Sequence, residues 1–263
     1  MIDFHVHTFL DPIAAKAIPQ IAKKAGGVTP VYSGAVSDLK PALREFGMEK
    51  AVVLNIATNP HQQKKVNDFA ISLIGDDMLI PFGSVHPDSP DALEELDRLK
   101  EAGIKGVKLH PEYQDFFVDE ERMFPIYEHI AELGLITVFH AGVDIGFPRP
   151  VHCPPERLLR VLDCFGDAPV VAAHFGGWLL WDSVLEELCG TKVYLDTAFS
   201  YGRMPPDYAR EIICAHGADH ILLGSDMPWS SSADEARFIQ SLGLPAGDEA
   251  KILSINAKRL LHI

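Results

Sequence analysis

Two histidines near the start of the chain have the spacing of a metal-chelating pair. In His5-Val6-His7 the imidazoles are two residues apart within an apolar run. Successive side chains of a β-strand point to opposite faces, so residues i and i+2 share one face. We therefore expect His5 and His7 to offer two nitrogen ligands to one metal ion. A hydrogen-bonded pair of core histidines would show the same spacing, so the pair alone is a weak indication.

Three further residues with metal-binding or acid–base side chains end apolar runs elsewhere in the chain. His140 closes the run 135–140, His174 closes the run 170–174, and Asp226 follows the run 221–225. Buried histidine and aspartate are costly unless they are paired or bound to a ligand. Their recurrence at the ends of several apolar runs favours one shared metal site over separate structural roles.

The elements that must position these residues are short apolar runs separated by amphipathic helical patterns, which is typical of βα units around a parallel sheet. Eight runs are rich in Val, Ile and Leu, and they are Ile2–His7, Ala51–Ile56, Ile80–Val85, Gly106–His110, Ile136–His140, Val170–His174, Lys192–Thr197 and Ile221–Ser225. This number predicts an α/β fold with a closed (β/α)₈ barrel, the TIM barrel. The carboxyl ends of its strands meet at one mouth, where active sites form.

The connections between the runs predict both helices and loops. Helical patterns cover Asp91–Ala102 and Glu120–Leu133, and a C-terminal helix is expected around Ile255–Leu261. Two connections are longer than a plain barrel needs: an extended loop region over Thr8–Lys50 after the first strand, and Ala141–Pro155, which carries Pro148 among its prolines. Both follow strand ends at the mouth, so we expect them to act as lids or specificity loops. No shift in composition divides the chain, and residues 1–263 are expected to form one domain.

The motifs together resemble the amidohydrolase superfamily, and specifically its amidohydrolase-2 branch of metal-dependent hydrolases and decarboxylases. The resemblance rests on the sequence at 2–7, Gly-Val-Lys-Leu-His-Pro at 106–111, His-Ala-Gly at 140–142, His-Phe-Gly-Gly at 174–177, Leu-Gly-Ser-Asp-Met-Pro-Trp at 223–229, and the last helix at 255–261.

This resemblance implies that His5, His7 and His140 are metal ligands, that Asp226 is a ligand or the base beside an activated water, and that His174 is an acid or base. Three nitrogens and a carboxylate suit a single zinc ion. Relatives with two metals would use His174 as a further ligand, so a two-metal site stays open.

Lys108 and His110 share one face of the fourth strand, because they alternate with Val107 and Leu109. In relatives with two metal ions, a carboxylated lysine or a glutamate on this strand bridges the two ions. Whether Lys108 is modified in this way stays open. We instead expect Lys108 and His110 to point inward and to bind a substrate carboxylate. The alternative is an ion pair between Lys108 and a carboxylate such as Asp3.

The sequence does not decide whether Asp196 and three tryptophans have functional or structural roles. Asp196 ends the seventh strand, where it could support a ligand through a hydrogen bond, touch substrate or cap the following loop. Trp178, Trp181 and Trp229 flank the site motifs and could stack on a ligand, although tryptophan more often packs in a core.

Composition excludes several classes of function. The chain has 37 acidic and 23 basic residues and a net charge of −14, which would repel nucleic acid and anionic membranes. Its four cysteines show no disulfide or C-x-x-C pattern. It has no span of about 18 apolar residues and no signal peptide, so a cytoplasmic protein is expected. Phosphate-binding glycine loops, the G-x-S-x-G elbow and H-E-x-x-H are absent from the sequence.

These observations favour a zinc-dependent hydrolase that acts on an amide, lactone or ester bond of a small carboxylated molecule. The alternative is a non-oxidative, metal-dependent decarboxylase of a small aromatic or unsaturated acid, and the short chain tips our preference to hydrolysis. A TatD-type metal nuclease is less favoured, because it would need a glutamate where Lys108 stands. A further alternative is a barrel that binds metal but catalyses no reaction. Loss of a ligand residue would indicate it, and all the candidate ligands are present in the sequence. The sequence leaves open the substrate and the oligomeric state, a homodimer included.

Overall fold

The computed structural model describes residues 1–147 and 149–263; Pro148, within the proline-rich segment expected to cover the site, lies outside them. Within the described residues eight parallel strands form two sheets, in the orders β1-β2-β3 and β4-β5-β6-β7-β8. Their bounds are β1 Ile2–Val6, β2 Lys50–Leu54, β3 Leu79–Phe82, β4 Gly106–Leu109, β5 Ile136–Phe139, β6 Val170–Ala172, β7 Tyr194–Asp196 and β8 Ile221–Leu222.

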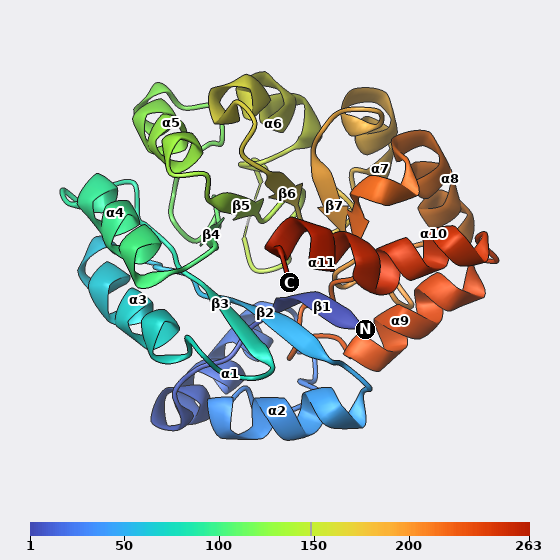
Figure 1. Cartoon of the computed structure of the whole chain (residues 1–263), viewed down its shortest axis with the longest axis horizontal. Coiled ribbons are helices and arrows are strands. Elements are labelled where there is room, and N and C mark those ends of the chain that lie inside the picture. Colours follow the sequence, from blue (N-terminus) through green and yellow to red (C-terminus); the bar gives the residue numbers. More distant parts are fainter. Residues whose placement is uncertain (148) are drawn as a thin grey trace.

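Backbone hydrogen bonds join the two sheets at both seams. Gly83, just after β3, donates its amide to the carbonyl of Gly106 in β4 at 3.0 Å. On the other side, Phe4 of β1 donates to the carbonyl of Leu223, just after β8, at 2.7 Å. The strands therefore form a closed ring, and the predicted (β/α)₈ barrel is confirmed (Figure 1).

Helices surround the ring of strands in Figure 1. Their bounds are α1 Asp11–Lys24, α2 Val36–Glu45, α3 Gln63–Ser72, α4 Ala92–Ala102, α5 Phe124–Glu132, α6 Pro155–Val161, α7 Trp181–Ser183, α8 Pro206–His216, α9 Ser232–Ser241, α10 Ala246–Ala250 and α11 Asn256–Leu261. Wider π-type turns continue α7 over 184–188 and link α10 to α11 over 251–255. The expected helix at 91–102 is α4, and the expected C-terminal helix is α11.

Local sequence explains where α4 begins and ends. Glu94 and Glu95 stand in its first turn, where the positive end of the helix dipole favours carboxylates. Gly103 follows its last turn with φ 93°, a left-handed conformation that glycine adopts without a steric penalty. The chain can therefore reverse at this point and enter β4.

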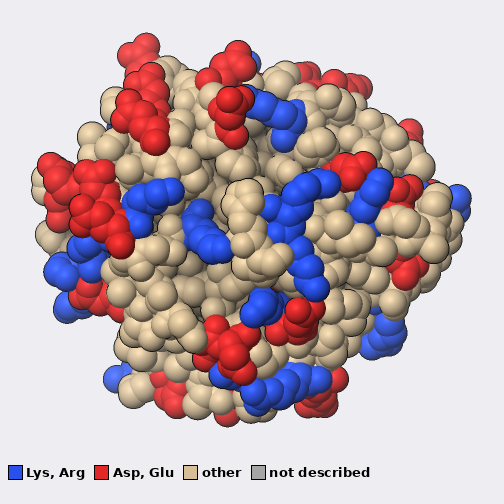
Figure 2. All heavy atoms as spheres, in the orientation of Figure 1, with Lys and Arg blue, Asp and Glu red and all other residues tan. Residues whose placement is uncertain are grey.

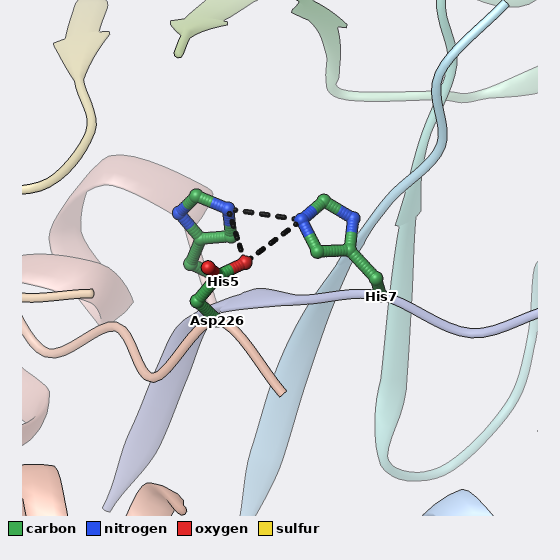
Figure 3. A group of neighbouring side chains, drawn as sticks. All are labelled: His5, His7 and Asp226. Carbon is green, nitrogen blue, oxygen red and sulfur yellow. Dashed lines mark hydrogen bonds and ion pairs between the residues drawn. The ribbon is translucent and has the colours of Figure 1, made fainter. Parts of the chain in front are cut away.

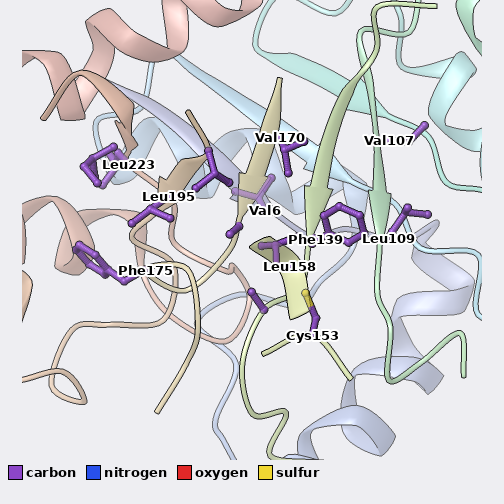
Figure 4. Packing of buried hydrophobic residues seen from close by; sticks show 14 of the residues in the cluster. Val6, Val107, Leu109, Phe139, Cys153, Leu158, Val170, Phe175, Leu195 and Leu223 are labelled. Atoms are coloured by element: carbon purple, nitrogen blue, oxygen red, sulfur yellow. The ribbon is translucent and has the colours of Figure 1, made fainter. Parts of the chain in front are cut away.

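Two apolar layers cover the two faces of the strands. The outer layer packs Val107, Leu109 and Leu195 against the surrounding helices (Figure 4). The inner layer is a separate cluster of strand residues, Ile2, Phe4, Val52, Leu54, Phe82, Ile136, Val138, Val171 and Leu222, that packs against Ala257, Leu260 and Leu261 of α11. The C-terminal helix therefore closes the end of the barrel where both termini lie (Figure 1).

The long connection over Thr8–Lys50 contains more regular structure than an extended loop. It holds α1 and α2, and both helices bury apolar side chains, among them Ile18 and Leu39. The expectation had followed from the length of this connection between the first two apolar runs. Pro19 and Pro41 stand inside these helices, whose buried faces stabilise them despite the lost backbone bonds.

Surface charge does not form a single acidic area on the face that shows the termini. Lysine and arginine side chains lie there beside aspartate and glutamate (Figure 2). In the part of the chain that the structure describes, no helix is long and apolar enough to cross a membrane.

Candidate metal centre

Three of the predicted ligands converge at the mouth of the barrel. The Nε2 atoms of His5 and His7 are 3.2 Å apart, and the Oδ1 atom of Asp226 lies 3.5 Å from the first and 3.1 Å from the second (Figure 3). These three side chains have the types and the spacing of metal ligands. His5 lies in β1, His7 directly follows it and Asp226 follows β8, so neighbouring strands bring the three together.

The opposite nitrogens of both imidazoles are held by hydrogen-bond acceptors. His5 Nδ1 lies 2.8 Å from Asp196 Oδ2, and His7 Nδ1 lies 2.8 Å from the carbonyl oxygen of Leu54. Since an acceptor fixes the proton on Nδ1, the lone pair of each Nε2 atom faces the group. Burial, and next the charge of Lys108, keep the pKa of His5 well below its usual value, so this imidazole is neutral.

A β-bulge in β1 turns His5 toward the barrel interior. Asp3 pairs with Ala51 and Val6 with Val53, so three steps along β1 match two steps along β2. Phe4 belongs to the inner apolar cluster and Val6 to the outer one. The extra residue lets His5 follow Phe4 on the inner side, which a regular strand would forbid.

Asp226 is held in a left-handed backbone conformation, with φ 67°. Its amide donates to the carbonyl of His5 at 2.8 Å, which ties the residue to β1. Burial alone would raise the pKa of Asp226, but its contacts with His7, His5 and His174 bring it below its usual value. The side chain is therefore an ionised carboxylate, as a metal ligand or a proton acceptor must be.

His174 lies between this group and His140. Its ring centroid is 5.3 Å from that of His5, and its Nε2 atom is 3.1 Å from His140 Nδ1. Its own Nδ1 lies 3.1 Å from the carbonyl oxygen of Ala198, and its φ is 60°. Strained, left-handed non-glycine residues cluster at functional sites, and both His174 and Asp226 are of this kind.

His140 belongs to a different group of neighbouring ligands in this geometry. Its ring stacks on His110, with centroids 4.2 Å apart, and the Nε2 atoms of these histidines lie 3.8 Å and 3.4 Å from Asp144 Oδ2. Among the described residues, His140 Nε2 is buried without a hydrogen-bond partner. The structure thus brings together His5, His7 and Asp226, and sets His140 beyond His174, where its predicted place in the same ligand set remains untested.

Lys108 points into the barrel, since Val107 and Leu109 lie in the outer apolar layer. Its side chain is 1% exposed, and its Nζ atom has no hydrogen-bond partner in residues 1–147 and 149–263. Burial lowers the pKa of Lys108 to about 8, while Asp196 and Asp226 oppose the shift. An ammonium group in this position needs an anion, or it loses its proton.

Asp3 does not supply that anion. Its carboxylate accepts the amides of His5 and Ser225, each at 3.0 Å, and the hydroxyl of Ser232. The alternative ion pair between Lys108 and Asp3 is absent among the described residues. Within residues 1–147 and 149–263, the ammonium group of Lys108 therefore has no hydrogen-bond or ion-pair partner.

An open cavity of about 430 Å³ lies at the mouth near His110 and is lined by Glu112, Tyr113, Asp115, Phe147, Arg149, Pro150 and His152. The ring of Phe147 meets that of Tyr113 edge-on, with centroids 4.8 Å apart, and Lys24 at the end of α1 lies 3.4 Å from the Phe147 centroid. The two long connections expected to act as lids therefore touch each other beside this cavity.

Sequence reasoning missed two carboxylates at the mouth. Asp144 lies four residues beyond His140, and Glu112 two residues beyond His110. Burial raises the pKa of Glu112 to about 7, and its Oε2 atom lies 3.7 Å from His110 Nδ1. Their position shortly after strand ends that carry histidine was the available signal.

Comparison with known proteins places the chain in a family. A family model described as amidohydrolase matches residues 2–263. A search of curated proteins found no match.

Solved structures share the fold at low sequence identity. A 5-carboxyvanillate decarboxylase from Sphingomonas paucimobilis has a TM-score of 0.75 at 15% identity, covering 100% of this chain and 99% of that one. A dihydroxybenzoic acid decarboxylase from a Polaromonas species, solved with manganese and 2-nitroresorcinol, has a TM-score of 0.70 at 16% identity, with 99% and 96% covered. A protein from Pseudomonas putida described as a 2-pyrone-4,6-dicarboxylic acid hydrolase has a TM-score of 0.68 at 18% identity, with 99% and 97% covered.

Proposed function

This chain belongs to the amidohydrolase family of metal-dependent enzymes, and we propose that it hydrolyses an amide, lactone or ester bond of a small carboxylated molecule. The observation that carries the proposal is the convergence of His5 Nε2, His7 Nε2 and Asp226 Oδ1, with both Nδ1 atoms held from behind by acceptors. Two neutral nitrogens and a carboxylate are the protein ligands of catalytic zinc sites that keep an open position.

The residues of this site fit a divalent cation, and we propose zinc. We propose His140 as the fourth ligand, as the family motifs imply. Its buried Nε2 atom has no hydrogen-bond partner among the described residues, and its ring would turn from Asp144 toward His5, His7 and Asp226 to reach the ion. When bound, the ion supplies the Lewis acidity that makes water a nucleophile near neutral pH. Manganese, present in a structural neighbour, is the alternative metal.

Proton transfers fall to two side chains of the chain itself. Asp226 is ionised and can accept the proton of the attacking water. His174 stands next to the ligand group and can give a proton to the leaving group, because imidazole exchanges protons near neutrality. The carbonyl of Ala198 fixes the His174 tautomer and so the nitrogen that faces the site.

Lys108 and His110 would bind the carboxylate of the substrate. Lys108 is a buried cation on the inner face of β4, and its Nζ atom has no partner among the described residues. A carboxylate bound there would satisfy the ammonium and place the rest of the molecule toward the mouth. The segment Phe147–Pro155 would cover it, and Pro148 within that segment lies outside the described residues. A cytoplasmic location remains a prediction.

Decarboxylation is the second candidate, and the structural neighbours favour it. Two of the proteins with the same barrel are decarboxylases of aromatic acids, and one is described as a hydrolase of a dicarboxylic acid. The same site could serve decarboxylation, with His174 delivering a proton to the carbon that loses its carboxylate.

One experiment distinguishes hydrolysis from decarboxylation. Protein purified without chelator and reconstituted with zinc is analysed for metal content, then supplied with lactones, amides, esters and aromatic acids while ring opening, acid release and carbon dioxide release are followed. We expect at least one zinc per chain and release of a carboxylic acid without carbon dioxide. Carbon dioxide as the product would establish the lyase instead. Less than about 0.3 zinc per chain would reject the metal centre, since such ligands fill readily.

A further inference from the structure

The loop between β7 and α8 carries a strained aromatic residue next to the proposed centre. Phe199 has φ 62°, a left-handed conformation that is a genuine outlier for a bulky residue, and its side chain is only 6% exposed. Its amide donates to the carbonyl of Ser225, the residue before Asp226, at 3.2 Å. The residue before it, Ala198, accepts the hydrogen bond from His174. Strain of this kind persists only where the surroundings impose it, and it is common at ligand sites.

Phe199 supports the guanidinium of Arg203. The Cζ atom of Arg203 lies 3.6 Å from the ring centroid, a cation–π contact. The group donates one further hydrogen bond, from Nη1 to the carbonyl of Tyr201 at 3.1 Å. A guanidinium has five N–H donors. Arg203 is exposed, and no carboxylate of the described chain lies within ion-pair distance of it, so most of these donors are open to solvent and to a ligand.

The carboxylates of Glu235 and Asp226 are used elsewhere. Partial burial lowers the pKa of Arg203, and the charges of these two carboxylates oppose that shift. Glu235 accepts the amide of Tyr201 at 2.9 Å and the hydroxyl of Ser230 at 2.7 Å. Asp226 faces the histidines. The buried Glu235 therefore fixes the loop that carries Arg203 without neutralising it.

A second unused donor contacts the same ring. Trp178, on the loop after β6, has its ring centroid 5.9 Å from that of Phe199. Its indole N–H is buried and has no acceptor within residues 1–147 and 149–263. Two side chains with spare N–H groups thus lie on Phe199, beside the residues that position His174 and Asp226.

We propose that Arg203, supported by Phe199 and neighboured by Trp178, is a second anion subsite of the active site, so that the substrate carries two separated carboxylates. Lys108 would hold one carboxylate from β4, and Arg203 the other from the loop after β7. These strands are three positions apart in the sheet order β4-β5-β6-β7-β8, and the amide of Phe199 ties the loop of Arg203 to Ser225, the residue before Asp226. The proposal rests on the proposed function, because it takes the ligand group as the place of reaction.

Binding of matched acids tests this subsite without knowledge of the substrate. Calorimetry of the zinc-loaded full chain would compare isophthalate with benzoate and adipate with hexanoate, pairs that differ by one carboxylate. We expect at least one dicarboxylate to bind about tenfold more tightly than its partner, the scale of a charge-assisted hydrogen bond. Arg203→Gln should remove this advantage and change the affinity for the monocarboxylate less than about twofold. Arg203→Lys, which keeps the charge but loses the planar stack, should restore part of it.

Arg210→Gln is the matched control, because Arg210 is an exposed arginine on α8. It should leave all affinities unchanged, and thermal unfolding of each variant reports whether it folds. The proposal is overturned if neither dicarboxylate is preferred, if Arg203→Gln keeps the preference, or if Arg210→Gln removes it equally. Zinc content, measured on the same samples, tests the metal centre separately, since a protein that binds zinc but shows no preference retains the centre and loses the subsite.

Discussion

Replacing Asp196 by asparagine tests how the ligand group is held. In the structure Asp196 Oδ2 accepts the Nδ1 proton of His5 at 2.8 Å, while Oδ1 accepts the amides of His174 at 2.9 Å and Ala198 at 3.1 Å. An asparagine carbonyl can replace Oδ1 and keep both backbone bonds. Its amide group then meets the Nδ1 proton of His5, so two donors face each other and the proton is driven to Nε2, the nitrogen that faces the metal.

The expected loss of zinc affinity follows from the hydrogen bond between Asp196 and His5. A hydrogen bond to a charged group contributes about 1.5–3 kcal/mol, and removal of a partner that orients a metal ligand typically lowers metal affinity about 10- to 100-fold. A factor of that size equals about 1.4–2.7 kcal/mol, so the two measures agree. We therefore expect Asp196→Asn to bind zinc about 10- to 100-fold more weakly than the unmodified chain.

Competition with a chromophoric zinc chelator at neutral pH would measure this affinity. Asp219→Asn is the control, because Asp219 is a carboxylate paired with Lys251 near the other end of the barrel, and its variant should bind zinc normally. Thermal unfolding would show whether Asp196→Asn keeps its fold. Zinc affinity of Asp196→Asn within twofold of the unmodified chain would refute the view that Asp196 fixes the His5 tautomer.

Three further outcomes are expected. His7→Ala should lose zinc and turnover together, whereas His174→Ala should keep zinc and lose at least about 100-fold in kcat, the range of a missing acid or base; loss of zinc from His174→Ala would favour a two-metal site. Lys108→Met should lower kcat/KM at least about tenfold for a carboxylated substrate at unchanged zinc content, and equal effects on an uncarboxylated analogue would exclude its role. Burial raises the pKa of Glu112 from 4.5 to about 7, so the folded chain binds the carboxyl proton of Glu112 more tightly than the unfolded chain. The protonated side chain therefore contributes stability below pH 4.5, and this contribution is lost as the pH rises to about 7. Glu112→Gln should gain on the order of 2 kcal/mol over the unmodified chain between pH 5 and pH 8, measured by urea unfolding, and parallel pH profiles would contradict this.

The sequence by itself determined the fold and the end of the barrel at which chemistry is concentrated. Eight buried apolar runs, each about as long as a strand, have one compact arrangement when helices separate them. The alternation of Lys108 with Val107 and Leu109 was enough to orient the lysine, because the outer face of a barrel strand must pack on helices. Family motifs at six places in the chain led to the same family as the whole-chain match.

Only the tertiary structure decided how the side chains meet. The bulge that turns His5 inward depends on pairing between β1 and β2, and no local pattern in Ile2–His7 reveals it. The contacts of His140 with His110 and His174, and of both stacked rings with Asp144, depend on loop conformation rather than on periodicity. Strand spacing repeats along the sequence and can be read from it, whereas the direction of a side chain just beyond a strand is set by residues that contact it from distant parts of the chain.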